Sequence, residues 1–358
     1  MILYRTRRKI KHWLKDNLRF YKTLFITQFS SVSDKTVFLE IDDLALNRYL
    51  FNFIKFFTLN GYTVYIPKNK KVISILNHNR GEFVYSSWIL NENVKIGIPA
   101  KADLVITKDQ LSNDYFGKSM ENSYHVPMSE YPGIYRNNIQ SDNNKAGQKR
   151  KRSVFMSGNI DTAHYKKISR SGFFDIPSRC EVAGFIQEQL YYFKIESLVD
   201  LKLYMSGETD YKVILIDTSR QFRIPLNKLK NILQEFHFYL ALPGILIPQS
   251  HNLIEAMSVG CIPIIHKTYA DLMFPTLKHL ETALVYDSMG ELDELIIKSI
   301  NLREDQIKSL EYNVQEYYSK HLSPAAVVKK IEENDFSKIY IQAEEKSLAL
   351  IKKDFSYD

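Results

Sequence analysis

The chain has 358 residues, of which 45% are hydrophobic and 25% are charged, ordinary globular usage that argues against disorder. A single hydrophobic core rarely grows to this size, so two domains are expected. The apolar runs are short and interrupted, which excludes a membrane-spanning helix, and no signal peptide is expected. Two cysteines exclude a disulfide scaffold and are too few for a thiolate zinc site. A reducing cytosol is therefore the expected compartment.

The net charge of +7 lies at the start of the chain. Residues 1–22 carry eight Lys or Arg side chains and one acidic side chain, Asp16, so the other residues sum to no net charge. A nucleic-acid-binding domain carries its basic residues on the folded body, and this body is neutral. We therefore expect no nucleic-acid partner.

Residues 1–25 predict a basic amphipathic helix. Apolar residues recur at helical spacing between the basic ones, and a helix of this kind can lie on an anionic membrane surface. The alternative is a first helix that packs on its own domain and leaves its charges solvated. The sequence leaves both open. The apolar residues are Ile10, Trp13, Leu14, Leu18, Tyr21 and Phe25.

Residues 26–140 predict a Rossmann-like domain with a parallel sheet. A β-branched and aromatic run over 36–41 is typical of a buried strand, and Asp42 and Asp43 follow it directly. A helix is expected over 46–59, and Asn60-Gly61 directly after it is expected to end it. Further strands are expected at 61–67, 94–99, 102–107 and 123–127.

Residues 141–152 are almost entirely polar and predict a linker to a second alternating domain over 153–335. A last helix within 336–358, over about 336–353, would cross back to the first domain. The expected architecture is α/β, with two Rossmann-like domains facing across a cleft and ligands bound outside the carboxyl ends of the strands. Strands of the second domain are expected at 153–157, 212–217, 236–242, 261–265 and 283–286, and helices at 226–235, 251–259, 290–301 and 305–319.

Several catalytic and cofactor motifs are absent from the sequence. There is no G-x-G-x-x-G for a dinucleotide, no H-E-x-x-H for zinc and no G-x-S-x-G for a hydrolase nucleophile. There is also no D-x-D, the acidic pair through which metal-dependent sugar transferases hold a nucleotide diphosphate. Together these absences predict that the protein uses no metal and no bound cofactor.

The most informative run lies over 236–275. A strand ends in Pro243 and Gly244, and a helix begins at Ser250, a good N-cap residue. The free N–H groups and positive dipole at the start of a helix suit a diphosphate. Glu255 lies about 7.5 Å further along the helix, where a carboxylate suits the hydroxyls of a ribose. The polar face of this helix is formed by His251, Asn252 and Glu255.

This run resembles the carboxyl-terminal donor-binding region of GT-B glycosyltransferases, most closely the exostosin-like group. In that group a strand ending P-x-G is followed by S-x-R-x-x-E-A, a G-C-x-P-V strand and an aromatic–acidic–x-x-P-F turn. The resemblance covers about 150–290 and implies the GT-B fold, a nucleotide-sugar donor, no metal, and inversion at the anomeric carbon. The spacing from Ser250 to Glu255 and the G-C-x-P element match this pattern well. The residues that this sequence offers for the whole pattern are Pro243, Gly244, Ser250, Glu255, Ala256, Gly260, Cys261, Pro263, Ile264, Tyr269, Asp271, Phe274 and Pro275.

Asn252 departs from the family pattern, which has Arg at this position. The departure removes one charge that would neutralise phosphate, and an inactive member of the fold could show the same change. His251, Arg220 or Arg223 could supply the charge instead. Arg223 precedes the strand at 236–242 by a distance similar to that of the family's upstream Arg.

A loop at the start of the second domain contains Gly158 and Asn159. In the GT-B fold this loop approaches the donor phosphates, and Gly158 would permit close backbone approach. The alternative is an ordinary turn, since Gly-Asn is a common turn pair. Arg179 also has two interpretations, a phosphate ligand or a surface ion pair.

An inverting transferase needs a general base for the acceptor hydroxyl, which the resemblance places in the first domain. Asp42 and Asp43 sit at the carboxyl end of a predicted strand, and two adjacent carboxylates there can supply a base. The alternative is an acidic N-terminal turn for the following helix. His125 and Glu130 are the other candidates.

These observations predict a metal-independent glycosyltransferase that moves a sugar from a nucleotide-sugar donor to a glycan or glycolipid acceptor. A lipid-linked acceptor would suit the basic segment at 1–22 and indicates bacterial surface polysaccharide or lipopolysaccharide synthesis. Nucleotide-sugars are made in the cytoplasm, so the enzyme is expected there, peripheral on the inner face of the membrane. The alternatives are a transferase of polyol phosphate and a catalytically inactive scaffold of the same fold, recruited to membranes.

Overall fold

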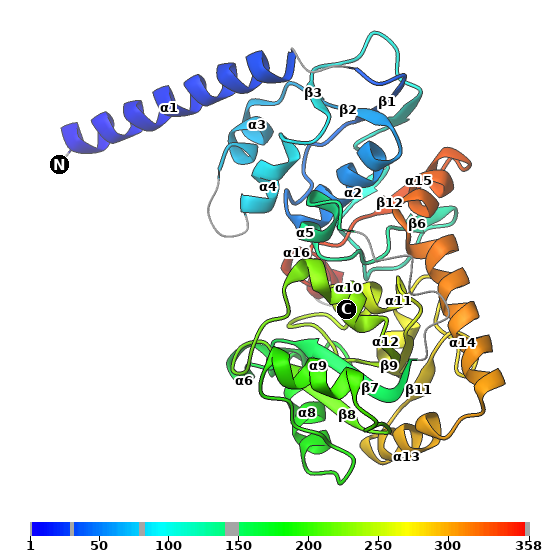
Figure 1. The fold of residues 1–358 in the computed structure, drawn as a ribbon. Helices are drawn as coiled ribbons and strands as arrows, with labels where there is room; N and C mark the ends of the chain where they lie inside the picture. The colour runs from blue at the N-terminus through cyan, green and yellow to red at the C-terminus, as the bar shows by residue number, and fades with distance from the viewer. Residues whose placement is uncertain (1, 29–31, 79–82, 140–149, 355–358) are drawn as a thin grey trace. The chain divides into compact units, whose positions relative to one another are not determined.

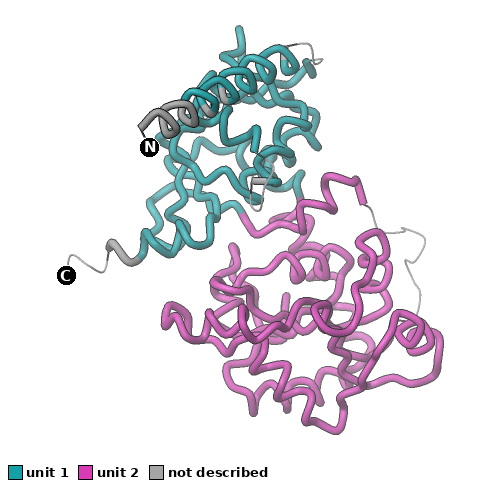
Figure 2. The backbone as a smooth tube through the Cα atoms, turned by 90° about the vertical axis from the view of Figure 1, so that its left-hand side faces the viewer, with its two compact units in different colours: residues 1–126, 324–358 teal, residues 127–323 magenta. Residues whose placement is uncertain are grey.

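The computed structural model describes residues 2–28, 32–78, 83–139 and 150–354. The chain divides into two compact units, which Figure 2 shows in different colours. Unit 1 comprises residues 1–126 and 324–358, and unit 2 comprises residues 127–323. Most of the predicted linker at 141–152 lies outside the described residues, and its last two residues begin a strand of unit 2.

The main sheet of unit 1 has four parallel strands in the order β3-β2-β1-β4. Val37, Leu39 and Val64 are fully buried, as expected for a parallel sheet covered on its faces. Helix α2 (Arg48–Leu59) begins where Asn47 accepts hydrogen bonds from two backbone N–H groups. The strands are β1 (Lys35–Leu39), β2 (Tyr62–Ile66), β3 (Val94–Ile96) and β4 (Leu104–Ile106).

Unit 1 also contains five helices besides α2 in its described part, and Figure 1 shows where they lie. Helix α1 packs on α3 and on β3. No helix in the described ranges combines the length and the apolar character needed to cross a membrane. The helices are α1 (Ile2–Gln28), α3 (Lys70–Leu76), α4 (Phe83–Ile89), α15 (Pro324–Glu332) and α16 (Glu345–Asp354).

A second, small sheet corrects the prediction of one helix over 336–353. Strand β12 (Lys338–Tyr340) lies between β5 (Leu111–Ser112) and β6 (Ser123–His125), and all three are parallel. Ile339 and Tyr340 are buried there, and the helix begins later, at α16. The helix-forming residues after position 344 made the whole run look helical, but burial between two strands decides the conformation of its start.

Unit 2 has one five-stranded parallel sheet in the order β11-β10-β9-β7-β8. Its strands lie within two residues of their predicted positions at nearly every end, because each is a short β-branched or aromatic run between turn residues. The predicted α/β class with two parallel-sheet units is therefore confirmed. The strands are β7 (Lys151–Gly158), β8 (Val213–Asp217), β9 (Phe236–Ala241), β10 (Ile262–His266) and β11 (Leu284–Tyr286).

Helices surround the sheet of unit 2, and the four predicted ones are all present. A hydrophobic core cluster lies where α8, α13 and α14 pack on the sheet. The helices are α5 (Pro132–Arg136), α6 (Thr162–Tyr165), α7 (Lys167–Ser171), α8 (Arg179–Gln187), α9 (Leu198–Ser206), α10 (Leu226–Leu233), α11 (His251–Met257), α12 (Lys267–Asp271), α13 (Met289–Ile300) and α14 (Glu304–Tyr317), and α14 continues into the π-helix η2 (Tyr318–Leu322).

The division between the units differs from the predicted domain boundaries at 140 and 335. Residues 127–139 group with unit 2, and 324–335 group with unit 1. The first difference has a local cause, because Glu130 forms a buried ion pair with Lys230 of α10 at 2.8 Å. Breaking a buried pair of this kind leaves an uncompensated charge, so this segment is held firmly by unit 2.

Candidate functional site

The two larger sheets each have one point where the strand order reverses. In unit 2 this point lies between β7 and β9, since β8 lies on the other side of β7. In unit 1 it lies between β1 and β4. Ligands of open parallel sheets bind outside the carboxyl ends of the strands at such points. Each of these two points has a pocket beside it.

The pocket of unit 2 has a volume of about 340 Å³. It lies at the carboxyl ends of β7 and β8 and beside the first turns of α11. Six of the nine predicted donor-binding residues line it, together with Tyr131, Tyr165 and Arg179. The six are Gly158, Asn159, Arg223, His251, Asn252 and Glu255.

Arg179 is the central cation of this pocket and is 3% exposed. Its Nε–H donates to the carbonyl oxygen of Pro243 at 3.0 Å, and Nη1 donates to that of Asn159 at 3.1 Å. Nη2 donates to the carbonyl oxygen of Leu242 and to Ser250 Oγ, at 3.4 and 3.3 Å. Arg179 is therefore not the surface ion pair that the sequence left as one alternative.

The acceptors around Arg179 are all neutral. Among the residues that the structure describes, no carboxylate lies within ion-pair distance of its guanidinium group, which lies 4.4 Å from the centre of the Tyr165 ring. Arginine stays charged in proteins, and a buried charge is costly unless an opposite charge accompanies it. An anionic ligand in the pocket would supply that opposite charge.

Gly158 has no side chain, and Arg179 and Asn252 lie close to where its Cβ atom would be. A Cβ atom on Gly158 would stand 2.8 Å from Arg179 Nη1 and 3.1 Å from Asn252 Nδ2. The Asn252 amide donates to the carbonyl oxygen of Ser157 at 2.7 Å. A guanidinium group from another part of the chain thus lies close to Asn252, the position at which the resembling family carries Arg.

Glu255 is buried, and its carboxylate is held on the wall of the pocket. Its Oε1 accepts a hydrogen bond from the backbone N–H of Tyr131 at 3.1 Å and lies 3.0 Å from His251 Nδ1. The rings of Tyr131 and His251 are tilted against each other at 5.4 Å. Two groups, the Tyr131 N–H before α5 and the His251 ring of α11, therefore fix one carboxylate, which is an arrangement suited to accepting hydrogen bonds from ligand hydroxyls.

The other predicted donor residues support the pocket from outside. Ser250 is the N-cap residue of α11, but its side chain caps no N–H of the helix and instead accepts from Arg179. Gly244 lies in a tight turn, where a Cβ would stand 2.7 Å from the carbonyl oxygen of Ile247. Helix α11 has seven residues, two fewer than predicted. Arg220 lies apart, exposed and 3.9 Å from Asp217.

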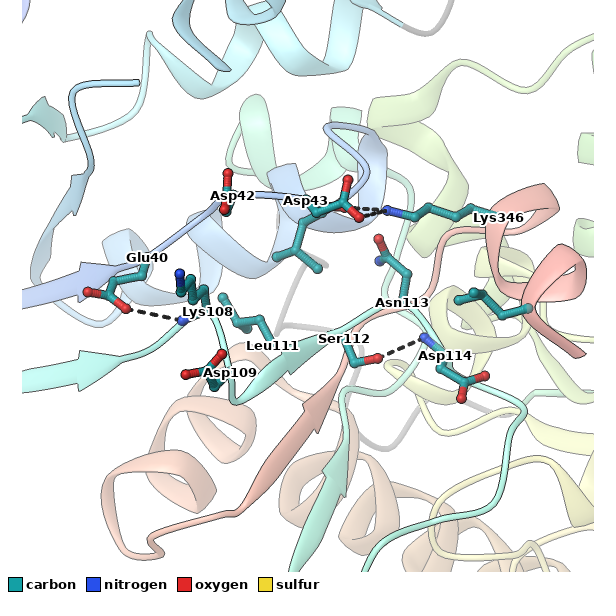
Figure 3. A pocket seen from close by; sticks show the side chains of 12 residues that line it. Glu40, Asp42, Asp43, Lys108, Asp109, Leu111, Ser112, Asn113, Asp114 and Lys346 are labelled. Atoms are coloured by element: carbon teal, nitrogen blue, oxygen red, sulfur yellow. Dashed lines mark hydrogen bonds and ion pairs between the residues drawn. The ribbon is translucent and has the colours of Figure 1, made fainter. Parts of the chain in front are cut away.

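The pocket of unit 1 has a volume of about 450 Å³, and Figure 3 shows it from close by. Asp42 and Asp43 both line it, and the Asp43 side chain is 98% exposed. Asp43 points toward Lys346, whose Nζ lies 3.8 Å from the carboxylate and donates to the backbone carbonyl of Asp43. The backbone N–H of Lys108 donates to Glu40 Oε2 at 3.3 Å.

A second hollow of unit 1, of about 650 Å³, adjoins this pocket and shares Glu40, Asp42 and Lys108 with it. Its walls include Phe38 and the exposed Ile98. Asp42 thus lies between a polar pocket and a more apolar one, at the carboxyl edge of the sheet. Among the described residues, no cluster of three or more His, Cys, Asp or Glu side chains has the arrangement of a metal site.

His125 and Glu130, the other candidates for the base, are both buried. His125 stacks on Tyr340 at 4.5 Å in the small sheet of unit 1, and burial lowers its pKa to about 4. Burial raises the pKa of Glu130, against the opposite effect of Lys230. Neither residue lines the three hollows described above, so neither reaches a substrate in them.

Comparison with known proteins finds distant structural likenesses. No family model matches the chain, and no curated protein matches it. Among solved structures, the N-terminal domain of Candida albicans trehalose-6-phosphate phosphatase is similar over 90% of this chain and 75% of its own, with 9% identity and a TM-score of 0.35. S. aureus TarM, crystallised with UDP, is similar over 75% of this chain and 54% of its own, with 10% identity and a TM-score of 0.36.

WaaG, a glycosyltransferase involved in lipopolysaccharide biosynthesis, is similar over 84% of this chain and 99% of its own. The identity is 12% and the TM-score 0.36. Likenesses this weak transfer neither fold nor function to this chain.

Proposed function

We propose that this protein is a glycosyltransferase of the GT-B type, which moves a sugar from a nucleotide-sugar to a glycan or glycolipid acceptor. The observation that carries the proposal is the buried guanidinium group of Arg179, which lines the unit 2 pocket among neutral acceptors. A nucleotide diphosphate supplies a negatively charged partner for this group, and arginine forms paired hydrogen bonds with phosphate oxygens.

The remaining groups of the pocket suit the rest of a nucleotide. Gly158 lets the phosphates approach the backbone at the end of β7. Glu255, held by Tyr131 and His251, accepts hydrogen bonds from the ribose hydroxyls. The arginine that the resembling family carries at position 252 is replaced, in this proposal, by Arg179 from the start of α8. This replacement is why Asn252 does not by itself indicate an inactive scaffold.

In the proposed reaction, the acceptor hydroxyl oxygen forms a bond to the anomeric carbon of the sugar. The bond between that carbon and the phosphate oxygen breaks, and its electron pair leaves with the nucleotide diphosphate. Arg179 stabilises the charge on the departing phosphate. The proton of the hydroxyl passes to Asp42 or Asp43, which serves as general base. Attack opposite the leaving group inverts the anomeric configuration.

The finer parts of the proposal concern metal, compartment and pathway. Arg179 supplies the positive charge at the phosphates, so we propose transfer without a metal ion, as the missing D-x-D motif indicates. We also propose a cytoplasmic enzyme, peripheral on the inner face of a membrane, that acts in bacterial surface polysaccharide or lipopolysaccharide synthesis. The exostosin-like relationship rests on the residues of the run at 236–275.

The test is nucleotide binding by the whole chain, measured as a thermal shift with EDTA present. The panel contains nucleoside mono- and diphosphates and common nucleotide-sugars. Saturating ligand at one hundred times Kd stabilises the folded state by about 2.7 kcal/mol, a shift of several degrees. We expect one nucleotide family to give this shift. If none does, the transferase proposal is wrong and the inactive scaffold is favoured.

Arg179→Met assigns the shift to the pocket. Because the substitution removes the buried cation but keeps an apolar stem, we expect binding of the nucleotide to weaken about hundredfold, or about 2.7 kcal/mol. Glu255→Gln, which keeps the shape of the side chain, tests the ribose contact should Arg179→Met unfold the pocket. Arg303→Met is the matched control, because Arg303 is exposed and pairs with Asp305 outside the pocket.

A further inference from the structure

Helix α1 exposes six large apolar side chains along one stripe, which we call the docking stripe. Their exposed fractions lie between 52% and 74%. Counted from Ile10, the other five lie 3, 4, 8, 11 and 15 residues further along, which at about 100° per residue places them on one side of the helix. A run of large side chains this exposed is unusual for a folded protein unless something covers it. The stripe consists of Ile10, Trp13, Leu14, Leu18, Tyr21 and Phe25.

Helix α1 is held on unit 1 by buried residues beside the docking stripe and by Asn17, which lies within the range of the stripe at about 100° per residue. Phe20 and Thr23 are buried, and Thr23 exchanges hydrogen bonds with Asn77 after α3, at 2.8 to 3.0 Å. Asn17 accepts a hydrogen bond from Lys70 at 2.6 Å. The helix therefore packs on its own unit, and Lys70 Nζ also lies 5.7 Å from the centre of the Trp13 ring at the edge of the docking stripe. Leu14 and Leu18 lie on the side of the helix away from Phe20 and Thr23, at about 100° per residue. Of the two alternatives that the sequence left open for α1, packing on its own domain is confirmed.

Basic side chains border the docking stripe on one side. Lys11, Lys15 and Lys22 are exposed and lie, at about 100° per residue, beside Leu18 at the edge of the docking stripe opposite Trp13. In the sequence, residues 1–22 carry eight basic side chains and one acidic one. An apolar stripe flanked by cations is the pattern of a helix that lies in the plane of a membrane surface.

Charge decides between a membrane and a second copy of this chain as the occupant. Two copies meeting through their docking stripes would bring two segments of net charge +7 together, and this repulsion opposes association. A bilayer with anionic headgroups instead attracts the same lysines while its acyl boundary takes the apolar side chains.

We propose that the docking stripe binds α1 flat on a membrane that contains anionic lipids, with Trp13 and Leu18 at the level of the upper acyl chains and the lysines among the headgroups. This inference deepens the peripheral location proposed above. It uses residues outside both pockets, so nucleotide binding and membrane binding can be tested and can fail separately.

The first experiment follows the whole chain with vesicles of phosphatidylcholine alone and with vesicles that also contain phosphatidylglycerol. Both tryptophans are in unit 1, so Trp88→Phe leaves Trp13 as the only indole. We expect Trp13 emission to move to shorter wavelength with the anionic vesicles, and the protein to sediment with them. Equal binding to both kinds of vesicle would overturn the role of the lysines, and binding to neither would overturn the proposal.

Leu14→Gln combined with Leu18→Gln tests the stripe itself, since glutamine keeps a good helix former at both positions. We expect vesicle binding to weaken tenfold or more, with the nucleotide shift unchanged. Val199→Gln with Leu203→Gln is the matched control, because these exposed residues have the same spacing on α9. Replacing Lys11, Lys15 and Lys22 with Gln should weaken binding about hundredfold at low salt. A dimer that the Leu pair abolishes would instead show a second copy as the occupant.

Discussion

The two strand-order reversal points of this molecule have the same topology and opposite character. In unit 2 two charged side chains of the pocket, Arg179 and Glu255, are buried, each with at least two fixed partners. In unit 1 the carboxylates of Asp42 and Asp43 project into solvent. The side chains of Arg179 and Glu255 in the unit 2 pocket are thus held in place without a ligand, whereas those of Asp42 and Asp43 in the unit 1 pocket are exposed to solvent.

The difference matches two kinds of chemical work. A buried, fixed cation interacts strongly with an anion, because little water is left to screen it and little reorganisation is needed. An exposed carboxylate exchanges protons readily and costs nothing to desolvate until a substrate covers it. Holding a diphosphate suits the first pocket, and accepting a proton suits the second.

The largest expected effect lies in unit 1. Asp42→Asn or Asp43→Asn, whichever residue is the base, should lower the rate of sugar transfer by about 10²- to 10⁴-fold, because the amide cannot take the proton. The affinity for the nucleotide should stay at the wild-type value. Transfer is measured as release of nucleoside diphosphate, and affinity by calorimetry.

Asp109→Asn is the control for this pair, because Asp109 is exposed and lines the same pocket. It should transfer sugar at the wild-type rate. Wild-type transfer by both Asp42→Asn and Asp43→Asn would show that the base lies elsewhere. If Asp42→Asn or Asp43→Asn also lowered the affinity for the nucleotide, the assignment of nucleotide binding to the unit 2 pocket and of proton transfer to the unit 1 pocket would be wrong.

A smaller effect is expected from crowding the unit 2 pocket. Gly158→Ala places a Cβ 2.8 Å from the Arg179 guanidinium and 3.1 Å from the Asn252 amide. Because both groups are fixed by hydrogen bonds, we expect nucleotide affinity to fall about tenfold, or about 1.4 kcal/mol. Calorimetry measures this change.

Gly184→Ala in α8 serves as the matched substitution, since nothing lies within 4 Å of its added Cβ. It should leave affinity unchanged and raise helix stability by about 0.5 to 1 kcal/mol. If Gly158→Ala bound the nucleotide with wild-type affinity, Arg179 and Asn252 would not be held rigidly in the pocket.

The last expected effect is on the stability of unit 1 against acid. Burial lowers the pKa of His125 to about 4, below the ordinary value of 6.5. The unfolded chain therefore takes up a proton below pH 6.5 while the folded unit does not, so stability is lost as the pH falls from 6.5 toward 4. We expect His125→Phe, which keeps a ring against Tyr340, to flatten this dependence.

Tryptophan fluorescence measures the unfolding of unit 1, because Trp13 and Trp88 both belong to it. His164→Gln is the comparison, since His164 is exposed in unit 2. An unchanged slope in His125→Phe would mean that His125 does not stay neutral in the folded unit.

The sequence predicts well what local patterns decide. The strands β7 and β9 and the helix beginning after Ser250 lie where alternation, β-branched runs and turn residues place them. The capping box at Ser178 and Glu181 is also visible in the sequence, and it places Arg179 at the first position of a helix.

What could not be predicted depends on contacts between distant positions. The four groups that hold Arg179 lie 20, 63, 64 and 71 residues away along the chain, so no local pattern shows that its side chain turns inward. Strand β12 pairs with segments more than 200 residues away, and helix-forming residues follow it directly. The exposure of the docking stripe likewise depends on which side of α1 packs on unit 1.

The discontinuity of unit 1 sets an order for folding during synthesis. Strand β12 is the middle strand of the small sheet, so β5 and β6 leave the ribosome before the strand that joins them exists. Unit 2 is one continuous stretch, 127–323, and its whole sheet is made before β12. The unit that begins first along the chain is therefore completed last, and until then the nascent protein carries unpaired strand edges of the kind that chaperones shield.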